Sequence, residues 1–151
     1  MNTNLKPKLA RFATATAFAC PICKEELQLM ENSLKCPHRH SYDLAKFGYV
    51  NLAPQIKQPK DYDKISFQNR QLILEAGFYQ AILEAVSNLL ASSETAKTVL
   101  DIGCGEGFYS RKLQEIHSQK TFYAFDISKD SIQLAAKSDS SFAVNWFVGD
   151  L

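Results

Sequence analysis

Apolar residues gather in three short runs in the second half of the chain, at Val99–Ile102, Thr121–Phe125 and Phe142–Val148. Runs of this length are typical of strands that are buried on both faces of a parallel sheet. Helical spacing of apolar residues begins at Phe108 after the first run and returns around Ile132 after the second. The alternation predicts the first β–α units of an α/β fold.

A longer helical pattern precedes these runs, from Lys64 to Ala91, and is interrupted at Gly77. Its apolar positions repeat at the spacing of a helix face, so we expect them to pack on the sheet. They are Leu72, Leu74, Ile82, Leu83, Val86, Leu89 and Leu90. Tyr79 follows the interruption, at a place where an aromatic ring can either lean over a ligand or fill the core.

Different patterns occupy the first part of the chain. Residues that favour strands flank Gly48 between Ser41 and Leu52, which predicts a short hairpin. The polar, proline-containing stretch Gln55–Asp63 predicts a linker. We therefore expect an N-terminal module over residues 1–56, a linker with helices over residues 57–92, and an α/β segment over residues 93–151.

The first apolar run carries Asp101 and breaks into three glycines, Gly103, Gly105 and Gly107. Glycine has no Cβ and tolerates positive φ, so a ligand can approach the backbone closely at such a turn. A dinucleotide fingerprint would place its third glycine at position 108, where this chain has Phe108. The spacing G-x-G-x-G after an Asp-bearing strand instead resembles motif I of Rossmann-like S-adenosylmethionine (SAM) methyltransferases. An ordinary glycine-rich β–α turn is the alternative.

Two further acids follow the other apolar runs. Asp126 ends the second run and Asp150 follows the third. An ionised Asp at the end of the second strand can accept hydrogen bonds from two ribose hydroxyls. Alone, either Asp is more often a helix N-cap or a turn residue. An acid at the end of each of three strands favours a ligand site.

Cysteine and histidine are concentrated near the N-terminus, in the spacing C-x2-C-x12-C-x3-H. Two knuckles of this kind supply four ligands to a tetrahedral zinc ion and leave no position for water, so we expect a structural site. The predicted ligands are Cys20, Cys23, Cys36 and His40, with His38 as the alternative histidine. Disulfides are the other interpretation of these cysteines. Cys104 lies apart, in the glycine turn, and we expect it to be a small buried side chain.

Composition is that of a globular protein, with 46% hydrophobic and 22% charged residues. The net charge of +1 hides an asymmetry, because residues 1–60 hold nine Lys and Arg against four Asp and Glu. A basic front part favours a polyanionic partner, although a solvated surface explains it almost as well. For single-stranded RNA, cations and aromatic rings near the zinc motif are candidates. They are Lys35, Arg39, Lys46, Tyr42, Phe47 and Tyr49. No stretch approaches the length of a membrane span, and we expect a cytoplasmic protein.

The quoted motifs together resemble the RlmA family of 23S ribosomal RNA (guanine-N1)-methyltransferases. The matching segments are CPIC with CPHRHSYDLAKFGYVNLAP, then EAGFYQAI, then VLDIGCGEGFY with FDISK. The resemblance implies a small zinc-ribbon-like module followed by a Rossmann-like SAM-methyltransferase fold with strand order 3-2-1. It is closest to the Gram-positive branch, whose target is a guanine in a hairpin loop of 23S ribosomal RNA.

The resemblance also implies roles for individual residues. Zinc is expected at Cys20, Cys23, Cys36 and His40, and SAM at Tyr79, Gly105 and Glu106, with Asp126 on the ribose. Asp150 is expected near the adenine amino group. Asp101, Gly103 and Gly107 complete the motif of the cofactor site. The sequence identifies no catalytic residue.

Methyltransferases of this fold have more strands than the three predicted here. We therefore expect the chain to be the N-terminal portion of a longer protein that forms an incomplete fold, is inactive alone and, at full length, is a candidate homodimer. One alternative is a stand-alone zinc-dependent RNA-binding module with a vestigial methyltransferase half. Another is a small-molecule methyltransferase, against which the basic zinc module argues.

Overall fold

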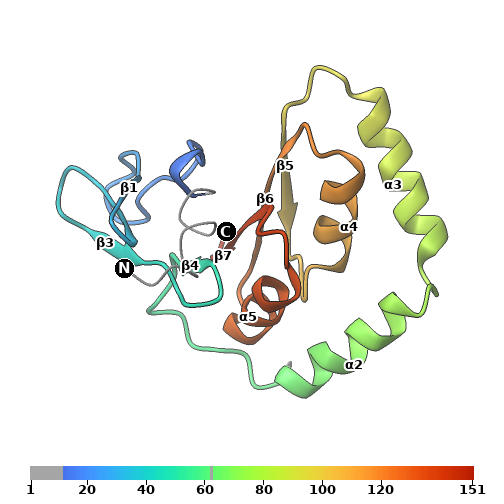
Figure 1. Ribbon diagram of the computed structural model, residues 1–151. Helices are drawn as coiled ribbons and strands as arrows, with labels where there is room; N and C mark the ends of the chain where they lie inside the picture. Colours follow the sequence, from blue (N-terminus) through green and yellow to red (C-terminus); the bar gives the residue numbers. More distant parts are fainter. Residues whose placement is uncertain (1–11, 62) are drawn as a thin grey trace.

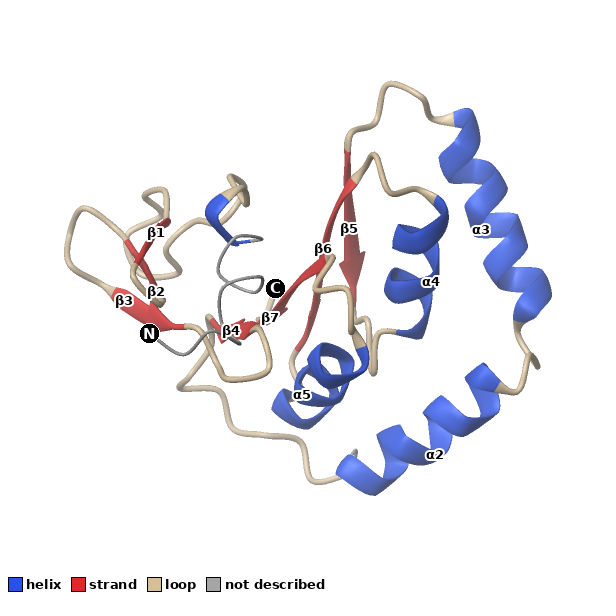
Figure 2. Ribbon diagram, in the orientation of Figure 1, coloured by secondary structure: helices blue, strands red, loops and turns tan. Residues whose placement is uncertain are grey.

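Residues 12–61 and 63–151 are described in a computed structural model, and they form two sheets of different kinds (Figures 1 and 2). The first sheet is antiparallel, with the order β1-β2-β3. Its strands are β1 (Gln28–Met30), β2 (Ser33–Lys35) and β3 (Ser41–Asp43). The second sheet is parallel, with the order β4-β7-β6-β5. Its strands are β4 (Tyr49–Asn51), β5 (Thr98–Ile102), β6 (Thr121–Asp126) and β7 (Val144–Val148).

The three apolar runs form β5, β6 and β7, which lie side by side in the predicted order 3-2-1. The third strand begins at Val144 rather than at the predicted Phe142. The carboxylate of Asp139 accepts the N–H groups of Ala143 and Val144, both at 3.1 Å, and Phe142 has a φ of +51°. This turn keeps Phe142 out of the extended conformation that a strand requires.

The predicted hairpin over Ser41–Leu52 is wrong in its pairing. β3 pairs with β2, whereas β4 pairs in parallel with β7, so that Val50 lies opposite Phe147. A single bridge between Leu44 and Val50 is what joins the two halves of the expected hairpin. An unpaired sheet edge is unfavourable, and pairing with β4 covers the edge of β7. Pairing of β4 with β3 would leave that edge bare. The N-terminal module therefore contributes a strand to the second sheet.

Four helices follow the N-terminal module: α2 (Lys64–Glu75), α3 (Gln80–Ser92), α4 (Phe108–Ile116) and α5 (Lys129–Ser138). Asp63 is the N-cap of α2, and its carboxylate accepts the N–H of Ser66 at 2.9 Å. The predicted interruption at Gly77 is confirmed, because Gly77 has a φ of +88° between α2 and α3. Figure 1 shows α2 and α3 outside α4 and α5, away from the sheet.

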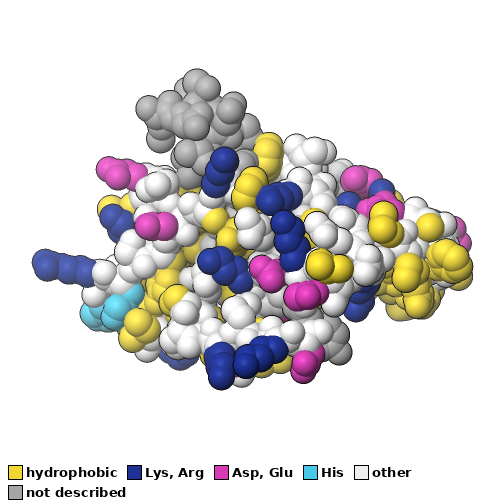
Figure 3. Space-filling model, turned by 90° about the horizontal axis from the view of Figure 1, so that it is seen from below, with side chains coloured by type: hydrophobic (Ala, Val, Ile, Leu, Met, Phe, Trp, Pro, Cys, Tyr) yellow, Lys and Arg dark blue, Asp and Glu magenta, His cyan; other side chains and the backbone are white. Residues whose placement is uncertain are grey.

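This outer position corrects the expected packing of the long helical region. Leu74 and Leu83 are buried, and Val86 and Leu90 pack partly against the same core. Leu72, Ile82 and Leu89 are instead 70%, 50% and 67% exposed. Because α2 contacts α4 and α5 and α3 contacts α4, only one stripe of each outer helix is covered. Figure 3 shows hydrophobic side chains gathered at the end of the molecule where α3 lies.

The parallel sheet separates two hydrophobic cores. On the helix side, Trp146 and Phe122 pack with residues of α4 and α5 such as Leu113 and Ile132. The other core joins Tyr123 and Phe147 of the sheet to the N-terminal module, including Phe12, Phe18 and Leu34. The Tyr123 hydroxyl also accepts the N–H of Ala17 at 3.3 Å. The module thus covers a face of the sheet. Within the described part of the chain, no helix is long and apolar enough to cross a membrane.

Candidate metal and cofactor sites

The side chains of Cys20, Cys23, Cys36 and His40 converge, with their ligand atoms all within 4.8 Å of one another. The Nδ1 atom of His40 lies 3.5 Å from the Cys20 sulfur and 3.3 Å from the Cys36 sulfur. Zinc–ligand bonds of about 2.0–2.3 Å in a tetrahedron span edges of about 3.3–3.8 Å. The separations and the soft donor set therefore fit one zinc ion with no open position.

Two tight turns place the four ligand atoms. The N–H of Lys24 donates to the Cys20 carbonyl at 2.8 Å, and the N–H of Arg39 donates to the Cys36 carbonyl at 3.1 Å. Lys24 and Arg39 both have positive φ, of 68° and 71°, which closes each turn within a few residues. His38 lies on the second turn, is exposed and does not join the cluster, so the geometry selects His40.

The cysteines are free thiols, and the Cys23 and Cys36 sulfurs are 3.6 Å apart, too far for a disulfide of about 2.05 Å. Burial alone would raise the pKa of the Cys20 thiol. The Tyr42 hydroxyl, 3.5 Å from its sulfur, and backbone N–H groups of the first turn outweigh that effect and lower the pKa to about 6. Because the thiolate is the metal-binding form, this environment favours zinc.

The second candidate site begins at the glycine turn after β5. The N–H groups of Gly103 and Cys104 donate to the Phe125 carbonyl, both at 2.9 Å. Gly103 and Gly105 have φ values of +72° and +58°, which L side chains rarely adopt. A Cβ at Gly103 would meet nothing within 4 Å, and one at Gly105 would meet only a Phe67 ring atom, at 3.9 Å. The turn therefore borders open space.

That space is a pocket of about 300 Å³. It is lined by Pro59, Phe67, Arg70, Gly105, Asp126 and Ser128, among others. A second pocket of about 480 Å³ shares Arg70 with the first and contains Tyr79 and Tyr109. Together the two hollows have the size range of small-molecule sites, and Arg70 borders both of them.

Asp126 is fixed by the backbone on both of its oxygens. Its Oδ2 accepts the N–H of Gly105 at 3.0 Å, and its Oδ1 accepts the N–H of Ser128 at 2.9 Å. A carboxylate has about four lone-pair positions, so each oxygen can accept one more hydrogen bond. The side chain is half-buried and lines the first pocket.

Glu106 is the most buried acid of this region, with 1% of its surface exposed. Burial raises its pKa, while its own backbone N–H and the nearby Arg70 and Arg111 act in the opposite direction. The Nε of Arg70 lies 3.4 Å from its Oε2. Among the described residues, that oxygen has no hydrogen-bond partner. Glu106 lines neither pocket, so Arg70 is the member of this ion pair that a ligand can reach.

Comparisons with known proteins agree with both sites. Residues 18–60 match the zinc-ribbon family described as "RlmA, N-terminal", and residues 93–146 match a methyltransferase domain. A Bacillus subtilis (strain 168) protein provisionally named 23S rRNA (guanine-N(1)-)-methyltransferase YxjB is 32% identical over 95% of this chain and 53% of its own length. These matches support the RlmA family for this chain. The match with the methyltransferase domain implies SAM as cofactor, and the zinc ribbon with its Cys3His cluster implies structural zinc.

Other proteins are also similar to this chain. A Streptomyces fradiae protein named 23S rRNA (guanine(748)-N(1))-methyltransferase is 26% identical over 79% of this chain and 44% of its own length. The crystal structure of the PH0226 protein from Pyrococcus horikoshii OT3 matches 48% of this chain and 32% of that chain, with 31% identity and a TM-score of 0.40. The chain spans about half the length of the curated relatives that it matches.

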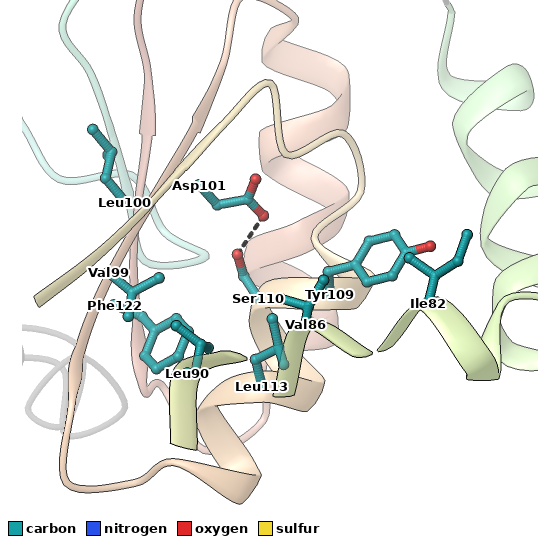
Figure 4. Close-up of a pocket in the computed structure, with 10 residues that line it drawn as sticks. All are labelled: Ile82, Val86, Leu90, Val99, Leu100, Asp101, Tyr109, Ser110, Leu113 and Phe122. Carbon is teal, nitrogen blue, oxygen red and sulfur yellow. Dashed lines mark hydrogen bonds between the residues drawn. The ribbon is translucent and has the colours of Figure 1, made fainter. Parts of the chain in front are cut away.

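Five residues predicted at the cofactor site of this chain lie outside the first pocket's lining: Tyr79, Asp101, Glu106, Gly107 and Asp150. The Asp101 carboxylate accepts the Ser110 hydroxyl at 2.6 Å and borders an apolar cavity of about 350 Å³ between β5, α3 and α4 (Figure 4). Burial raises its pKa. Gly107 faces the core rather than the pocket. Asp150 is exposed, and its carboxylate accepts the N–H of Leu151.

Gly107 allows the turn to pack closely against Trp146 and Ala135. Its φ is +80°, and it caps the N-terminus of α4. A Cβ there would lie 2.7 Å from the Trp146 ring atom Cζ3 and 2.9 Å from the Ala135 Cβ. Cys104 is buried, as predicted, and burial raises its pKa well above the ordinary value.

The RNA-facing candidates separate by burial. Tyr42 and Tyr49 are buried, and the Tyr42 hydroxyl contacts the Cys20 sulfur, so neither ring can stack on a base. Phe47 is half-buried with the Lys137 ammonium 4.4 Å from its ring centre. Arg39 and Lys46 are exposed and Lys35 is half-buried. The cations are thus accessible to a ligand at the surface, and the two tyrosines are not.

Sequence reasoning missed the contribution of the linker and of α2. Gln58 donates to the Ile127 carbonyl at 3.3 Å and accepts the Lys129 N–H at 2.7 Å, which fixes the linker to the loop after Asp126. Phe67 and Arg70 of α2 then close the pocket. A polar linker and an exposed helix give no local signal of this contact, which depends on tertiary packing.

Proposed function

We propose that this chain is the zinc- and SAM-binding part of an enzyme that methylates N1 of a guanine in 23S ribosomal RNA. The names of the relatives support the substrate, and the two matched domains support the chemistry. The observation that carries the proposal is the joining of both domains in one sheet. β4 follows the metal cluster directly and pairs with β7, two strands from the glycine turn.

In this proposal the four zinc ligands are Cys20, Cys23, Cys36 and His40, and the metal is structural. Zinc holds the two turns together, and the module presents exposed cations such as Arg39 and Lys46 to RNA phosphates. Because the same module packs on Tyr123 and Phe147, an RNA bound to it lies at a fixed position relative to the sheet.

SAM supplies an electrophilic methyl group on a sulfonium. The residues of this chain bind and orient it: Asp126 accepts the ribose hydroxyls, and the open backbone at Gly103 and Gly105 admits the ligand. Tyr79 lines the second pocket, and Glu106 pairs with Arg70 beside it. Asp150 is proposed near the adenine from its place after β7. Guanine N1 must lose a proton as it is methylated, and we assign that step to no residue of the described chain.

The test is calorimetric titration of the protein with SAM, together with mass spectrometry of 23S ribosomal RNA for N1-methylguanine. Asp126→Ala is expected to weaken SAM binding by about 1–3 kcal/mol, since ligand hydroxyls lose a buried acceptor. Gly105→Val is expected to abolish it, because the side chain fills the pocket. Unchanged SAM affinity in both variants would exclude the assigned cofactor site. A homodimer of the longer protein belongs to the same proposal and is tested by sedimentation.

A further inference from the structure

Arg70 stands at the junction of the two pockets and has few partners. It lines both the hollow at the glycine turn and the one that contains Tyr79. Its side chain is 59% exposed. Within the described part of the chain, Arg70 forms one ion pair, with Glu106, and its guanidinium donates no hydrogen bond. A guanidinium has five N–H donors, so most of them are available to a ligand.

Glu106, on the other side of that ion pair, is short of hydrogen-bond donors. Its Oε2 has no such donor in the described residues, although the residue is 1% exposed. A buried carboxylate is costly unless it is paired and hydrogen-bonded, and a 3.4 Å ion pair to an exposed cation meets that need incompletely. Because Glu106 lines neither pocket, it acts on a ligand only through Arg70.

We propose that Arg70 binds the α-carboxylate of SAM. The inference rests on the proposed function and adds a residue that fixes one end of the cofactor. Glu106, 3.4 Å from the Arg70 Nε and buried behind it, holds the guanidinium in place. A guanidinium suits a carboxylate because its planar fork can donate two parallel hydrogen bonds.

The position of Asp126, the proposed acceptor of the ribose hydroxyls, indicates how SAM is oriented in the two pockets. Asp126 lies at one end of the first pocket with both oxygens anchored, so the adenosyl part is held there. The amino-acid end must then extend past Gly105. Arg70 is the residue that the first pocket shares with the second, and it lies on that path.

Helix α2, which carries Arg70, is held in place beside the pockets by hydrogen bonds and packing. Asp63 caps its N-terminus, and Gln71 donates to the Ser138 hydroxyl of α5 at 2.9 Å. Phe67, one turn before Arg70, is buried and lies near Gly105. These contacts place the base of the Arg70 side chain without using its guanidinium.

The experiment compares two ligands that differ only in the group concerned. SAM and decarboxylated SAM share the adenosyl part, the sulfonium and the ammonium, and only SAM has the carboxylate. Their Kd values are measured by calorimetry for the intact protein, for Arg70→Ala and Arg70→Lys, and for Lys64→Ala. Lys64 is an exposed cation at the start of the same helix, so its variant controls for lost positive charge.

We expect Arg70→Ala to raise the Kd for SAM about 10- to 100-fold, the usual range for a lost charged hydrogen bond. Its Kd for decarboxylated SAM should be unchanged, which also shows that the pocket is folded. Arg70→Lys should fall between, and Lys64→Ala should match the unsubstituted protein. Equal losses for both ligands, or no loss for either, would overturn the role of Arg70. Failure of the unsubstituted protein to bind either ligand would overturn the proposed function itself.

Discussion

The metal cluster and the cofactor pocket differ in how far along the chain their parts lie. All four zinc ligands fall within Cys20–His40, and each pair is set by one tight turn. The cofactor pocket draws on residues from Pro59 to Ser128, carried by the linker, α2, the glycine turn and the loop after β6. The first site depends on local spacing and the second on tertiary packing. We therefore expect substitutions at the metal cluster and at the cofactor pocket to destabilise different parts of the molecule.

The largest expected effect is the loss of zinc in Cys36→Ser. Structural zinc provides about 10–16 kcal/mol to small zinc domains, so its loss should unfold β1–β3. The sheet should remain but lose the cover that Phe12 and Phe18 give to Tyr123 and Phe147. We expect hydrogen exchange to show lost protection in β1–β3 and weakened, not abolished, protection in β6.

His38→Ala is the control for this experiment, because His38 is exposed and outside the cluster. Its zinc content should equal that of the unsubstituted protein, while His40→Ala should lose the metal. Zinc retained by His40→Ala and lost from His38→Ala would reverse the ligand assignment.

The next effect compares two glycines of the same turn. Gly107→Ala places a Cβ against Trp146 and Ala135, whereas Gly103→Ala places one in open space, and both positions have positive φ. The backbone cost of about 1–2 kcal/mol is shared, and overpacking adds about 1–3 kcal/mol at Gly107 alone. We expect Gly107→Ala to lower the unfolding free energy by about 2–5 kcal/mol, measured by denaturant titration.

Gly103→Ala should lose about 1–2 kcal/mol by the same measurement. Equal losses in the two variants would mean that Gly107 serves the ligand rather than the helix–sheet contact.

The features that could be predicted from the sequence are those that depend on residues close together along the chain. The three strands with their order and the break at Gly77 are confirmed, and the four side chains predicted to bind zinc do converge. Spacing could not show that β4 leaves its expected hairpin, because the choice between partners depends on the bare edge of β7. Nor could helical periodicity show which apolar stripe of α3 is covered, since α4 rather than the sheet contacts it.

The same distinction explains the mixed outcome at the cofactor site. Gly105 and Asp126 lie where the motif places them and touch each other through one hydrogen bond. Asp101 and Gly107 belong to the same motif but face the core, where they hold α4. A motif thus fixes the turn as a whole. Which of its residues meet the ligand depends on the helix and strand packed beneath.

A third prediction concerns the stability cost of the cofactor pocket. Burial raises the pKa of Glu106 in the folded protein above its ordinary value. Below the ordinary value of 4.5 the neutral acid costs little, and the folded state loses stability as pH rises through the raised pKa. We expect Glu106→Gln to match the unsubstituted protein near pH 4 and to exceed its stability by about 1 kcal/mol near pH 8.

The measurement is the unfolding free energy as a function of pH, with Glu94→Gln as control. Glu94 is an exposed glutamate in the loop after α3, and its variant should show no such pH-dependent gain. A gain for Glu106→Gln that is equally large at low pH would point to packing rather than charge.

The smallest expected effect lies beside the metal. The Tyr42 hydroxyl is 3.5 Å from the Cys20 sulfur, is buried, and has a raised pKa because of burial and the neighbouring thiolates. It therefore acts as a hydrogen-bond donor to a zinc ligand, and such partners are commonly worth 10- to 100-fold in metal affinity. Tyr42→Phe keeps the ring that packs with Leu34 and removes only that donor. We expect zinc affinity, measured by competition with a chelator, to fall about tenfold while β1–β3 stay folded with zinc in excess. If Tyr42→Phe binds zinc normally but binds RNA more weakly, the tyrosine belongs to the RNA surface after all.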